Sequence, residues 1–195
     1  MPMPRSKGFE PSEALEKAMR LFWQNGYEKT SVCELLQVMG INRGSMYDTF
    51  GDKQALFLAA LKRYEETKSK QLLLFLEREG PVRETLYELF SQLPHMTLVD
   101  GKKCGCFMVN TANEISIHNQ RITQLVQRNF NLFHEGFERI LLRGKKTGEL
   151  SLELDACSTA RFLTNSFIGL ATISKVTTDP EVLTDIVKTT LSLVR

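Results

Sequence analysis

The sequence contains little cysteine and no long apolar run. Its 195 residues include four cysteines, at positions 33, 104, 106 and 157, which are too few and too irregularly spaced for a disulfide framework, so we expect reduced thiols. No segment approaches the roughly 18 apolar residues of a membrane span, and the N-terminal segment lacks the apolar core of a signal peptide. We therefore expect a cytoplasmic protein that does not enter a membrane.

The charge is almost balanced. With 25 Lys and Arg against 23 Asp and Glu, the net charge of +2 neither establishes nor excludes nucleic-acid binding, because a local basic surface decides that, and a homodimer would double it. The apolar fraction of 42% and the charged fraction of 25% are typical of a soluble globular protein. No Gly-rich phosphate loop or cofactor motif is present, so we expect no cofactor.

Helical periodicity dominates the chain, and no alternating run marks a sheet, so we predict an all-α fold of about nine helices. The first runs from Ser12, a possible N-cap, to Gly26; the second starts at Thr30 or Ser31 and ends at Gly40. A third follows Asn42 as N-cap and ends before Gly51. Further helices are predicted at about 53–78, 82–93, 105–117, 121–146, 155–175 and 180–194. We expect a domain boundary near residue 50, giving a small N-terminal helical domain 1–51 and a larger helical bundle 52–195.

The second and third helices form a helix-turn-helix. Only a two-residue step separates them, and Ile41 and Met46 occupy the positions of a hydrophobic staple. The recognition helix of such a motif lies in the major groove, where its outward side chains must be short. Gly44 and Ser45 meet that requirement. The large residues Met46 and Phe50, one turn apart, are expected to face the core.

Several side chains of this segment are suited to DNA contacts. Arg43 can reach a guanine edge in bidentate fashion or pair with a phosphate, and Tyr47 offers a stiff hydroxyl donor to a phosphate oxygen. Lys53 combines a positive charge with the free N–H groups of a helix start, and Thr30 or Ser31 offers a similar site. Taken alone, Tyr47 would equally be a surface tyrosine; the combination indicates DNA binding.

On these features, residues from about 12 to 58 resemble the DNA-binding domain of the TetR family of transcriptional regulators. The matching residues are Ala14 to Ala18, Leu21 to Tyr27, Thr30 to Val32, Leu35 to Gly40, Ser45 to Tyr47, Phe50, Lys53, Ala55 and Leu56. The resemblance implies an all-helical homodimer that places two recognition helices in successive major grooves of a near-palindromic double-stranded operator, usually as a repressor. It implies that the DNA-facing residues are Thr30, Asn42, Arg43, Gly44, Ser45, Tyr47, Asp48, Thr49 and Lys53.

Asp48 is the awkward member of this set. Phosphates repel a carboxylate, so Asp48 would have to accept a hydrogen bond from a cytosine N4 or orient Arg43. The sequence preference on DNA stays open for that reason.

The resemblance also implies a C-terminal region that binds a small-molecule inducer and dimerises through its last two long helices, at about 155–194. Mixed apolar and small residues at 160–173 agree with a partner-facing helix, although an internal bundle core is the alternative. Eight large residues can line an apolar pocket or simply form the core: Phe75, Phe90, Met96, Phe107, Met108, Phe130, Phe133 and Phe137. The inducer would be small and apolar or electrophilic.

The stretch CGCFMVNTANE, residues 104–114, adds polar groups to this region. Some TetR relatives that sense electrophiles or oxidants carry a Gly-Cys at a comparable place, which suggests Cys106 as a reactive thiol whose pKa Lys102 and Lys103 would lower. The alternative is a buried thiol acting as a small hydrophobe. The predicted ligand-binding residues are Cys106, Phe107, Asn110, Asn113, Glu114, Phe130, Phe133 and Phe137.

We predict no metal site and no enzyme. Cys104 and Cys106 are two residues apart and would point to different sides of a helix, Glu114 and His118 more often share a hydrogen bond than a metal ion, and His95 and His134 are isolated. A rival hypothesis is a helical thiol enzyme that uses Cys104 or Cys106 as nucleophile, but no nearby His is positioned as its base. A regulator without any small ligand is a third possibility.

Overall fold

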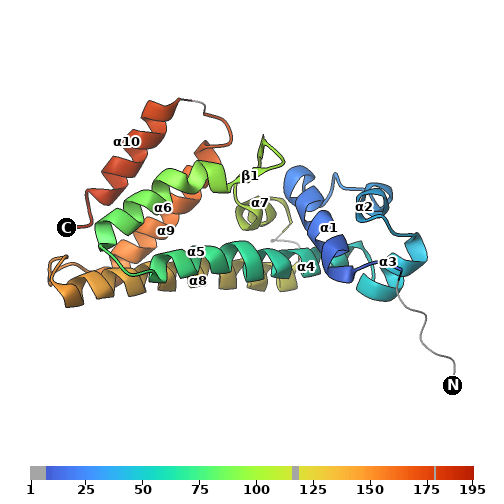
Figure 1. The fold of residues 1–195 in the computed structure, drawn as a ribbon, viewed down its shortest axis with the longest axis horizontal. Coiled ribbons are helices and arrows are strands. Elements are labelled where there is room, and N and C mark those ends of the chain that lie inside the picture. Colours follow the sequence, from blue (N-terminus) through green and yellow to red (C-terminus); the bar gives the residue numbers. More distant parts are fainter. Residues whose placement is uncertain (1–7, 116–118, 178) are drawn as a thin grey trace, which may run out of the picture. The chain divides into compact units, whose positions relative to one another are not determined.

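The computed structural model describes residues 8–115, 119–177 and 179–195, and helices dominate these residues (Figure 1). The elements are α1 (Pro11–Asn25), α2 (Val32–Met39), α3 (Arg43–Phe50), α4 (Lys53–Tyr64), the π-helical segment η1 (Glu65–Ser69), α5 (Lys70–Glu77), α6 (Val82–Met96), β1 (Leu98–Val99), β2 (Lys102–Lys103), α7 (Phe107–Glu114), α8 (Gln120–Thr147), α9 (Ala156–Ile173) and α10 (Pro180–Leu191). Helical residues continue without a break from Lys53 to Glu77, so α4, η1 and α5 count as one helix. Counted in this way, the described chain has nine helices, as predicted.

The only strands in the described chain form a short hairpin. β1 and β2 pair antiparallel, with Val99 opposite Lys102. Between them Asp100 and Gly101 both have positive φ, 49° and 78°, as a type I′ turn requires. No strand was predicted anywhere in the chain from its sequence, so the hairpin was missed.

The chain divides into two compact units, residues 1–64 and 65–195. In the first, α1 packs on α2 and α4 around an aromatic core in which the Phe22 and Phe57 rings meet edge to face at 5.0 Å. Trp23 and Tyr64 make the same kind of contact, also at 5.0 Å. The unit extends beyond the predicted boundary at residue 51 because one face of α4, from Leu56 to Tyr64, is buried in this core.

The start of α1 differs from the prediction, and the start of α2 is one of the two that were predicted. Ser12 is not the N-cap of α1: the helix begins at Pro11, whose fixed φ suits the first helical position, and Glu10 precedes it without a side-chain cap. The cap of α2 is Ser31, whose hydroxyl accepts from the Glu34 N–H while the Glu34 carboxylate accepts from the Ser31 N–H at 2.8 Å. This is a complete capping box.

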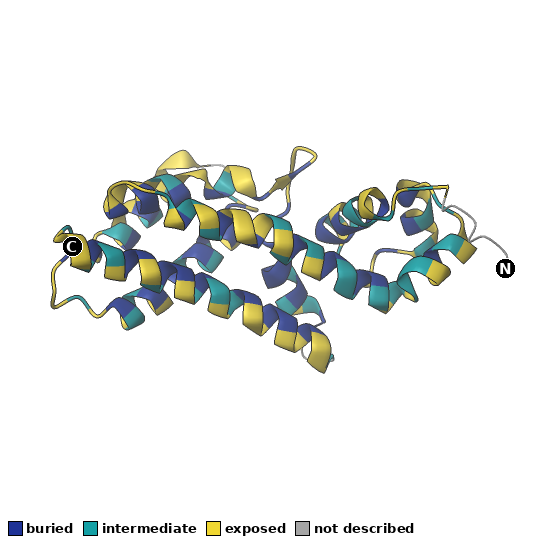
Figure 2. Cartoon of the chain, turned by 60° about the horizontal axis from the view of Figure 1, so that its bottom comes forward, coloured by how far each residue is buried: buried dark blue, intermediate teal, exposed yellow. Residues whose placement is uncertain are grey.

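In the second unit α8 packs against α5, α7 and α9, while α6 packs against α9 and α10. Figure 2 shows the buried residues on the helix faces turned toward one another. Phe90, Phe133, Phe137 and Phe167 form an aromatic cluster with ring centroids 5.6–5.9 Å apart. No described helix has the length and apolar character needed to cross a membrane.

Some helix ends in this unit depart from the predicted positions. α7 starts at Phe107 instead of 105, because Gly105 has a φ of +69°, which a right-handed helix does not allow. α6 continues through Pro94 to Met96, and α10 ends at Leu191.

Candidate DNA-binding interface and sensor site

The helix α3 is built to present a short polar face. The Asn42 side chain accepts a hydrogen bond from the Ser45 N–H at 2.9 Å, which confirms Asn42 as its N-cap. Gly40 adopts the left-handed conformation that ends α2 and allows the tight turn. Met46 is fully buried, so it anchors α3 from behind as predicted, whereas Phe50 is only half-buried.

The other side of α3 faces outward. Arg43, Gly44 and Asp48 are exposed, Ser45 and Thr49 are half-buried, and the Tyr47 side chain is 46% exposed. The residues that were predicted to contact DNA on this helix therefore share an accessible surface. In the described part of the chain Asp48 makes no ion pair with Arg43, so an orienting role for Asp48 stays a prediction.

Lys53 is positioned at the start of α4 by a neighbouring ring. Its ammonium lies 4.3 Å from the centroid of the Tyr27 ring, a cation–π contact. Burial of Tyr27, and then the negative charges of Glu28 and Asp52, raise the pKa of its hydroxyl, so the ring stays neutral beneath the ammonium. Asp52 caps this helix by accepting from the Ala55 N–H at 2.7 Å.

Thr30 does not belong to the accessible surface. Its side chain is fully buried, and its hydroxyl donates to the Gly26 carbonyl at 2.6 Å, which ties the turn between α1 and α2. The prediction of Thr30 as a DNA contact is therefore corrected. Ser31, the alternative, is exposed next to it at the start of α2.

The predicted ligand residues are dispersed over the second unit. Phe107, Phe133 and Phe137 are buried, Glu114 and Phe130 are half-buried, and Asn113 is exposed. Asn110 spans two elements: its amide N–H donates to the Cys104 carbonyl at 2.8 Å, and its amide oxygen accepts from the Lys175 ammonium at 3.1 Å. His118 lies outside the described residues, so the suggested pairing of Glu114 with His118 cannot be placed.

The thiols at the start of α7 are enclosed. Cys104 and Cys106 are each 7% exposed, and Cys106 is the N-cap residue of α7 without a side-chain cap bond. Burial raises the pKa of the Cys104 thiol, an effect that Lys175 and Lys102 only partly oppose. In this conformation Cys104 therefore has the character of a buried apolar side chain.

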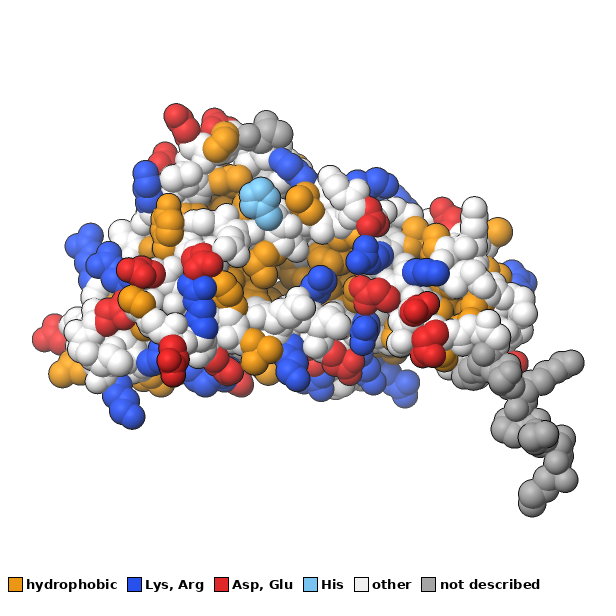
Figure 3. Space-filling model, viewed as in Figure 1, with side chains coloured by type: hydrophobic (Ala, Val, Ile, Leu, Met, Phe, Trp, Pro, Cys, Tyr) orange, Lys and Arg blue, Asp and Glu red, His pale blue; other side chains and the backbone are white. Residues whose placement is uncertain are grey.

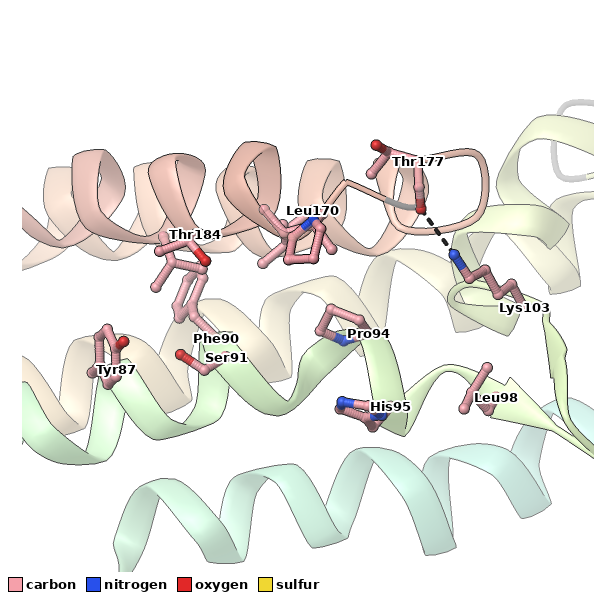
Figure 4. Close-up of a pocket in the computed structure, with 13 residues that line it drawn as sticks. Tyr87, Phe90, Ser91, Pro94, His95, Leu98, Lys103, Leu170, Thr177 and Thr184 are labelled. Carbon is pink, nitrogen blue, oxygen red and sulfur yellow. Dashed lines mark hydrogen bonds between the residues drawn. The ribbon is translucent and has the colours of Figure 1, made fainter.

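A cavity of about 360 Å³ lies elsewhere in the second unit, between α6, α9, α10 and the hairpin. Figure 3 shows apolar side chains gathered at the surface of this region, and Figure 4 shows the lining residues. They are Tyr87, Phe90, Ser91, Pro94, His95, Leu98, Lys103, Leu170, Thr177, Pro180, Leu183, Thr184 and Val187. None of the eight predicted ligand-binding residues is among them. Phe90 alone of this lining belongs to the set of large residues expected from the sequence to line a pocket.

The cavity has an apolar wall, the hydroxyl groups of Tyr87, Ser91 and Thr184 toward one end, and nitrogen-bearing side chains at the other. Phe90, Leu170 and Val187 supply apolar wall, whereas His95 and Lys103 lie at the hairpin end. The Lys103 ammonium donates to the Thr177 carbonyl at 2.8 Å, which holds the charge beside the cavity (Figure 4). The volume of the cavity falls in the range of about 300–1,000 Å³ that is usual for small-molecule sites.

The two units together define a helix-turn-helix regulator with a helical sensor domain, and comparison with known proteins agrees. Residues 14–60 match the family described as "Bacterial regulatory proteins, tetR family", and residues 83–190 match "Tetracyclin repressor-like, C-terminal domain". The chain belongs to the TetR family of bacterial transcriptional regulators.

Individual relatives extend along almost the whole chain. It is 35% identical to YezE of Bacillus subtilis (strain 168), an uncharacterized HTH-type transcriptional regulator, over 98% of this chain and 99% of YezE. It is 30% identical to the HTH-type transcriptional repressor ComR of Escherichia coli (strain K12), over 97% of this chain and 90% of ComR.

A solved structure shows the same fold on DNA. A cysteine mutant of the TetR family regulator CifR, complexed with 26-base-pair double-strand operator DNA, superposes with a TM-score of 0.85 at 26% identity, covering 96% of this chain and 98% of that one. These relatives favour a DNA-binding regulator over the thiol-enzyme alternative.

Proposed function

We propose that the protein is a homodimeric transcriptional repressor that acts in the cytoplasm and leaves its operator when a small molecule occupies the cavity between α6, α9 and α10. The observation that carries the DNA-binding part is the capped helix α3, anchored by Met46 and exposing Arg43, Gly44 and Tyr47. The CifR–operator complex supports placing this surface in the major groove. Two copies would read half-sites about 34–36 Å apart.

The DNA-binding part is tested with an operator obtained by selection from random duplex DNA. Arg43→Ala is expected to weaken binding and to relax preference at particular base pairs, since a bidentate contact to guanine is worth about 1–3 kcal/mol. Tyr47→Phe is expected to weaken binding to most sequences alike, because it removes only a phosphate contact. Fluorescence anisotropy measures both; unchanged operator affinity in both variants would show that another surface binds DNA.

Dimerisation is assigned to the outer face of α9 and α10. Phe162, Gly169 and Ile173 stand at i, i+7 and i+11 on α9; Phe162 and Ile173 are exposed and Gly169 is half-buried, while the opposite face of α9 is buried within its own bundle. On α10 Val182 is exposed. Several exposed apolar residues on one side of two helices favour an interface with a partner helix over a solvent-exposed surface.

Gly169 offers a sharp test of this assignment. A Cβ built there meets nothing within 4 Å, so a side chain can leave the backbone at this position without a clash in the protomer itself, and Gly169→Leu is the test variant. In a close helix–helix interface the same side chain would separate the partners. We expect a folded monomer in sedimentation equilibrium, with unchanged helical circular dichroism; a persisting dimer of wild-type affinity would move the interface elsewhere.

The cavity suits a ligand with an apolar, planar body and an anionic or strongly accepting end. Phe90 and Leu170 contact the body, and Lys103 and His95 reach the polar end. Anilinonaphthalene sulfonate has this chemistry and serves as the probe. Lys103→Met is expected to reduce its affinity several-fold, and Lys102→Met, an exposed neighbour outside the lining, is the control. Equal effects of the two substitutions would count against the site.

Cys106 as an electrophile sensor stays a prediction. Its burial means that reaction would require local opening of the segment before α7. Operator release by an electrophile in the wild type but not in Cys106→Ser would establish it.

A further inference from the structure

Three side chains of different chemistry meet on the second unit, outside the lining of the cavity. His134 and Glu138 stand one turn apart on α8, and Cys157 stands in the first turn of α9. The Cys157 Sγ lies 4.0 Å from the His134 Nε2, and that nitrogen lies 3.8 Å from a Glu138 carboxylate oxygen. One ligand atom from each residue lies within 4.8 Å of the others. We propose that these residues bind a thiophilic divalent metal ion such as Zn²⁺.

The backbone brings the donors together for identifiable reasons. His134 and Glu138, at i and i+4, share one face of α8, and α8 packs along α9. Asp155 caps α9 by accepting from the Ser158 N–H at 3.1 Å, which fixes the first turn that carries Cys157. The two faces that carry the donors are therefore held in place by the scaffold, and only side-chain rotation is needed to close the site.

The donor set and its spacing fit zinc. Thiolate sulfur, imidazole nitrogen and carboxylate oxygen are the three ligand types that Zn²⁺ takes in proteins, at about 2.3, 2.0–2.1 and 2.0–2.2 Å. In a tetrahedral site these lengths place sulfur and nitrogen about 3.6 Å apart, and nitrogen and oxygen about 3.4 Å apart. The observed 4.0 and 3.8 Å each need to shorten by about 0.4 Å. The sulfur–oxygen separation, which is within 4.8 Å, needs to reach about 3.6 Å. Rotation of the three side chains brings the donors together. The ion takes the place of the thiol proton, which is released to solvent when the Zn–S bond forms.

All three residues are half-buried, so an ion can reach them from solvent. Three protein ligands leave the fourth position for water or another donor, as at exchangeable zinc sites. The His134 Nδ1 is buried and has no hydrogen-bond partner among the described residues, so the supporting contact that tight zinc sites give their histidines is missing. We therefore expect exchangeable binding of moderate affinity instead of a permanent structural ion.

The simpler alternative is a weak His134–Glu138 ion pair beside a thiol that fills space. That arrangement needs no metal and gives the chain no affinity for one at this place. The two interpretations therefore differ in whether the purified protein binds a metal ion at these three residues.

The test is titration of the full, untagged, reduced chain with Co²⁺, whose thiolate complexes show a charge-transfer absorption band. We expect a band that saturates at one ion per chain and is displaced by Zn²⁺. Cys157→Ser should abolish it, whereas Cys33→Ser, which removes an exposed thiol of the first unit, should retain it. Absence of the band in wild type, or its survival in Cys157→Ser, would overturn the proposal.

Two further variants protect the test from trivial loss of folding. Glu138→Gln and His134→Gln keep the side-chain size and are expected to weaken Zn²⁺ binding about tenfold or more, since even loss of an outer contact to a ligand commonly costs 10–100-fold. Zn²⁺ should also raise the unfolding temperature of wild type, because it joins α8 to α9, and not that of Glu138→Gln. Equal Zn²⁺ affinity in wild type and both variants would refute the assigned ligands.

Discussion

Lys53 gives the most quantitative test of the proposed DNA surface. Its ammonium is held over the Tyr27 ring at the start of α4, where free backbone N–H groups already favour an anion. If it contacts a phosphate, Lys53→Ala removes one phosphate contact from each protomer and therefore two from a bound dimer. Binding should weaken on all sequences alike, because a phosphate carries no base identity.

The size of the effect follows from counterion release. Each neutralised phosphate contributes about −0.9 to the slope of log K against log salt, so losing two changes the slope by about 1.8. If the contribution of a phosphate contact to K is taken as zero at about 1 M salt, the linear relation makes one contact increase the binding constant roughly fivefold at about 0.15 M salt. Two contacts increase it roughly 30-fold. We therefore expect operator affinity to fall about 30-fold at that salt concentration and the deficit to shrink as salt is raised.

The assay is fluorescence anisotropy on the selected operator at four or five salt concentrations. Lys62→Ala is the matched control: Lys62 is exposed on the same helix, about 13 Å further along it, and should leave the slope unchanged. Lys53→Arg should retain most of the slope because it keeps the charge. Since the cation–π contact is lost as well, thermal unfolding of the variant must first show a folded first unit. If Lys53→Ala binds the operator more weakly but keeps the wild-type slope of log K against log salt, a phosphate contact by Lys53 is refuted.

Three further predictions concern the scaffold. Ser31→Ala should destabilise the first unit by about 1 kcal/mol in chemical denaturation, because the side-chain cap of α2 is lost. Hydrogen bonds from the Ser31 hydroxyl and N–H lower the Glu34 pKa, so their stabilisation is present above the unfolded pKa and is lost as pH falls through the folded one. The variant keeps the N–H and should therefore show a smaller loss over that pH range. Glu149→Gln should cost about 1–2 kcal/mol, because the Glu149 carboxylate accepts from the first N–H groups of α6, Val82 at 2.7 Å among them. Gly136→Ala should be net destabilising by up to about 2 kcal/mol: its Cβ would lie 2.7 Å from a Leu73 methyl group of α5, and the overpacking cost of about 1–3 kcal/mol exceeds the roughly 1 kcal/mol that Ala gains over Gly inside α8.

The helix-turn-helix could be predicted closely because its determinants are local. The caps Asn42 and Asp52 each bond a residue three positions away, and Gly40 and Gly51 end their helices through backbone conformations open to glycine. Such short-range signals are complete within a few letters of sequence. The same locality explains the error at Ser12, since Pro11 one residue earlier satisfies the helix start without any side-chain bond.

Features that depend on tertiary packing could not be predicted in the same way. Thr30 and Ser31 are both acceptable caps by residue type, and only the packing of α1 on α2 decides that Thr30 is buried. His134 is isolated in the sequence because its near neighbours include no thiol, whereas Cys157, 23 positions later, reaches it through the packing of α8 on α9. The cavity likewise combines α6, the hairpin and α10, whose register no local pattern encodes.

The position of α10 links the two proposed properties of the second unit. Thr184 and Val187 of this helix line the cavity, while Val182 and Thr189 project from the other side, where the partner is proposed to pack. A ligand that changes the placement of α10 against α6 must therefore change the surface offered to the partner. By linkage the reverse holds to the same degree: a change in dimer affinity produced by ligand equals the change in ligand affinity produced by dimerisation. Probe affinity of the Gly169→Leu monomer, compared with that of the dimer, measures this coupling directly.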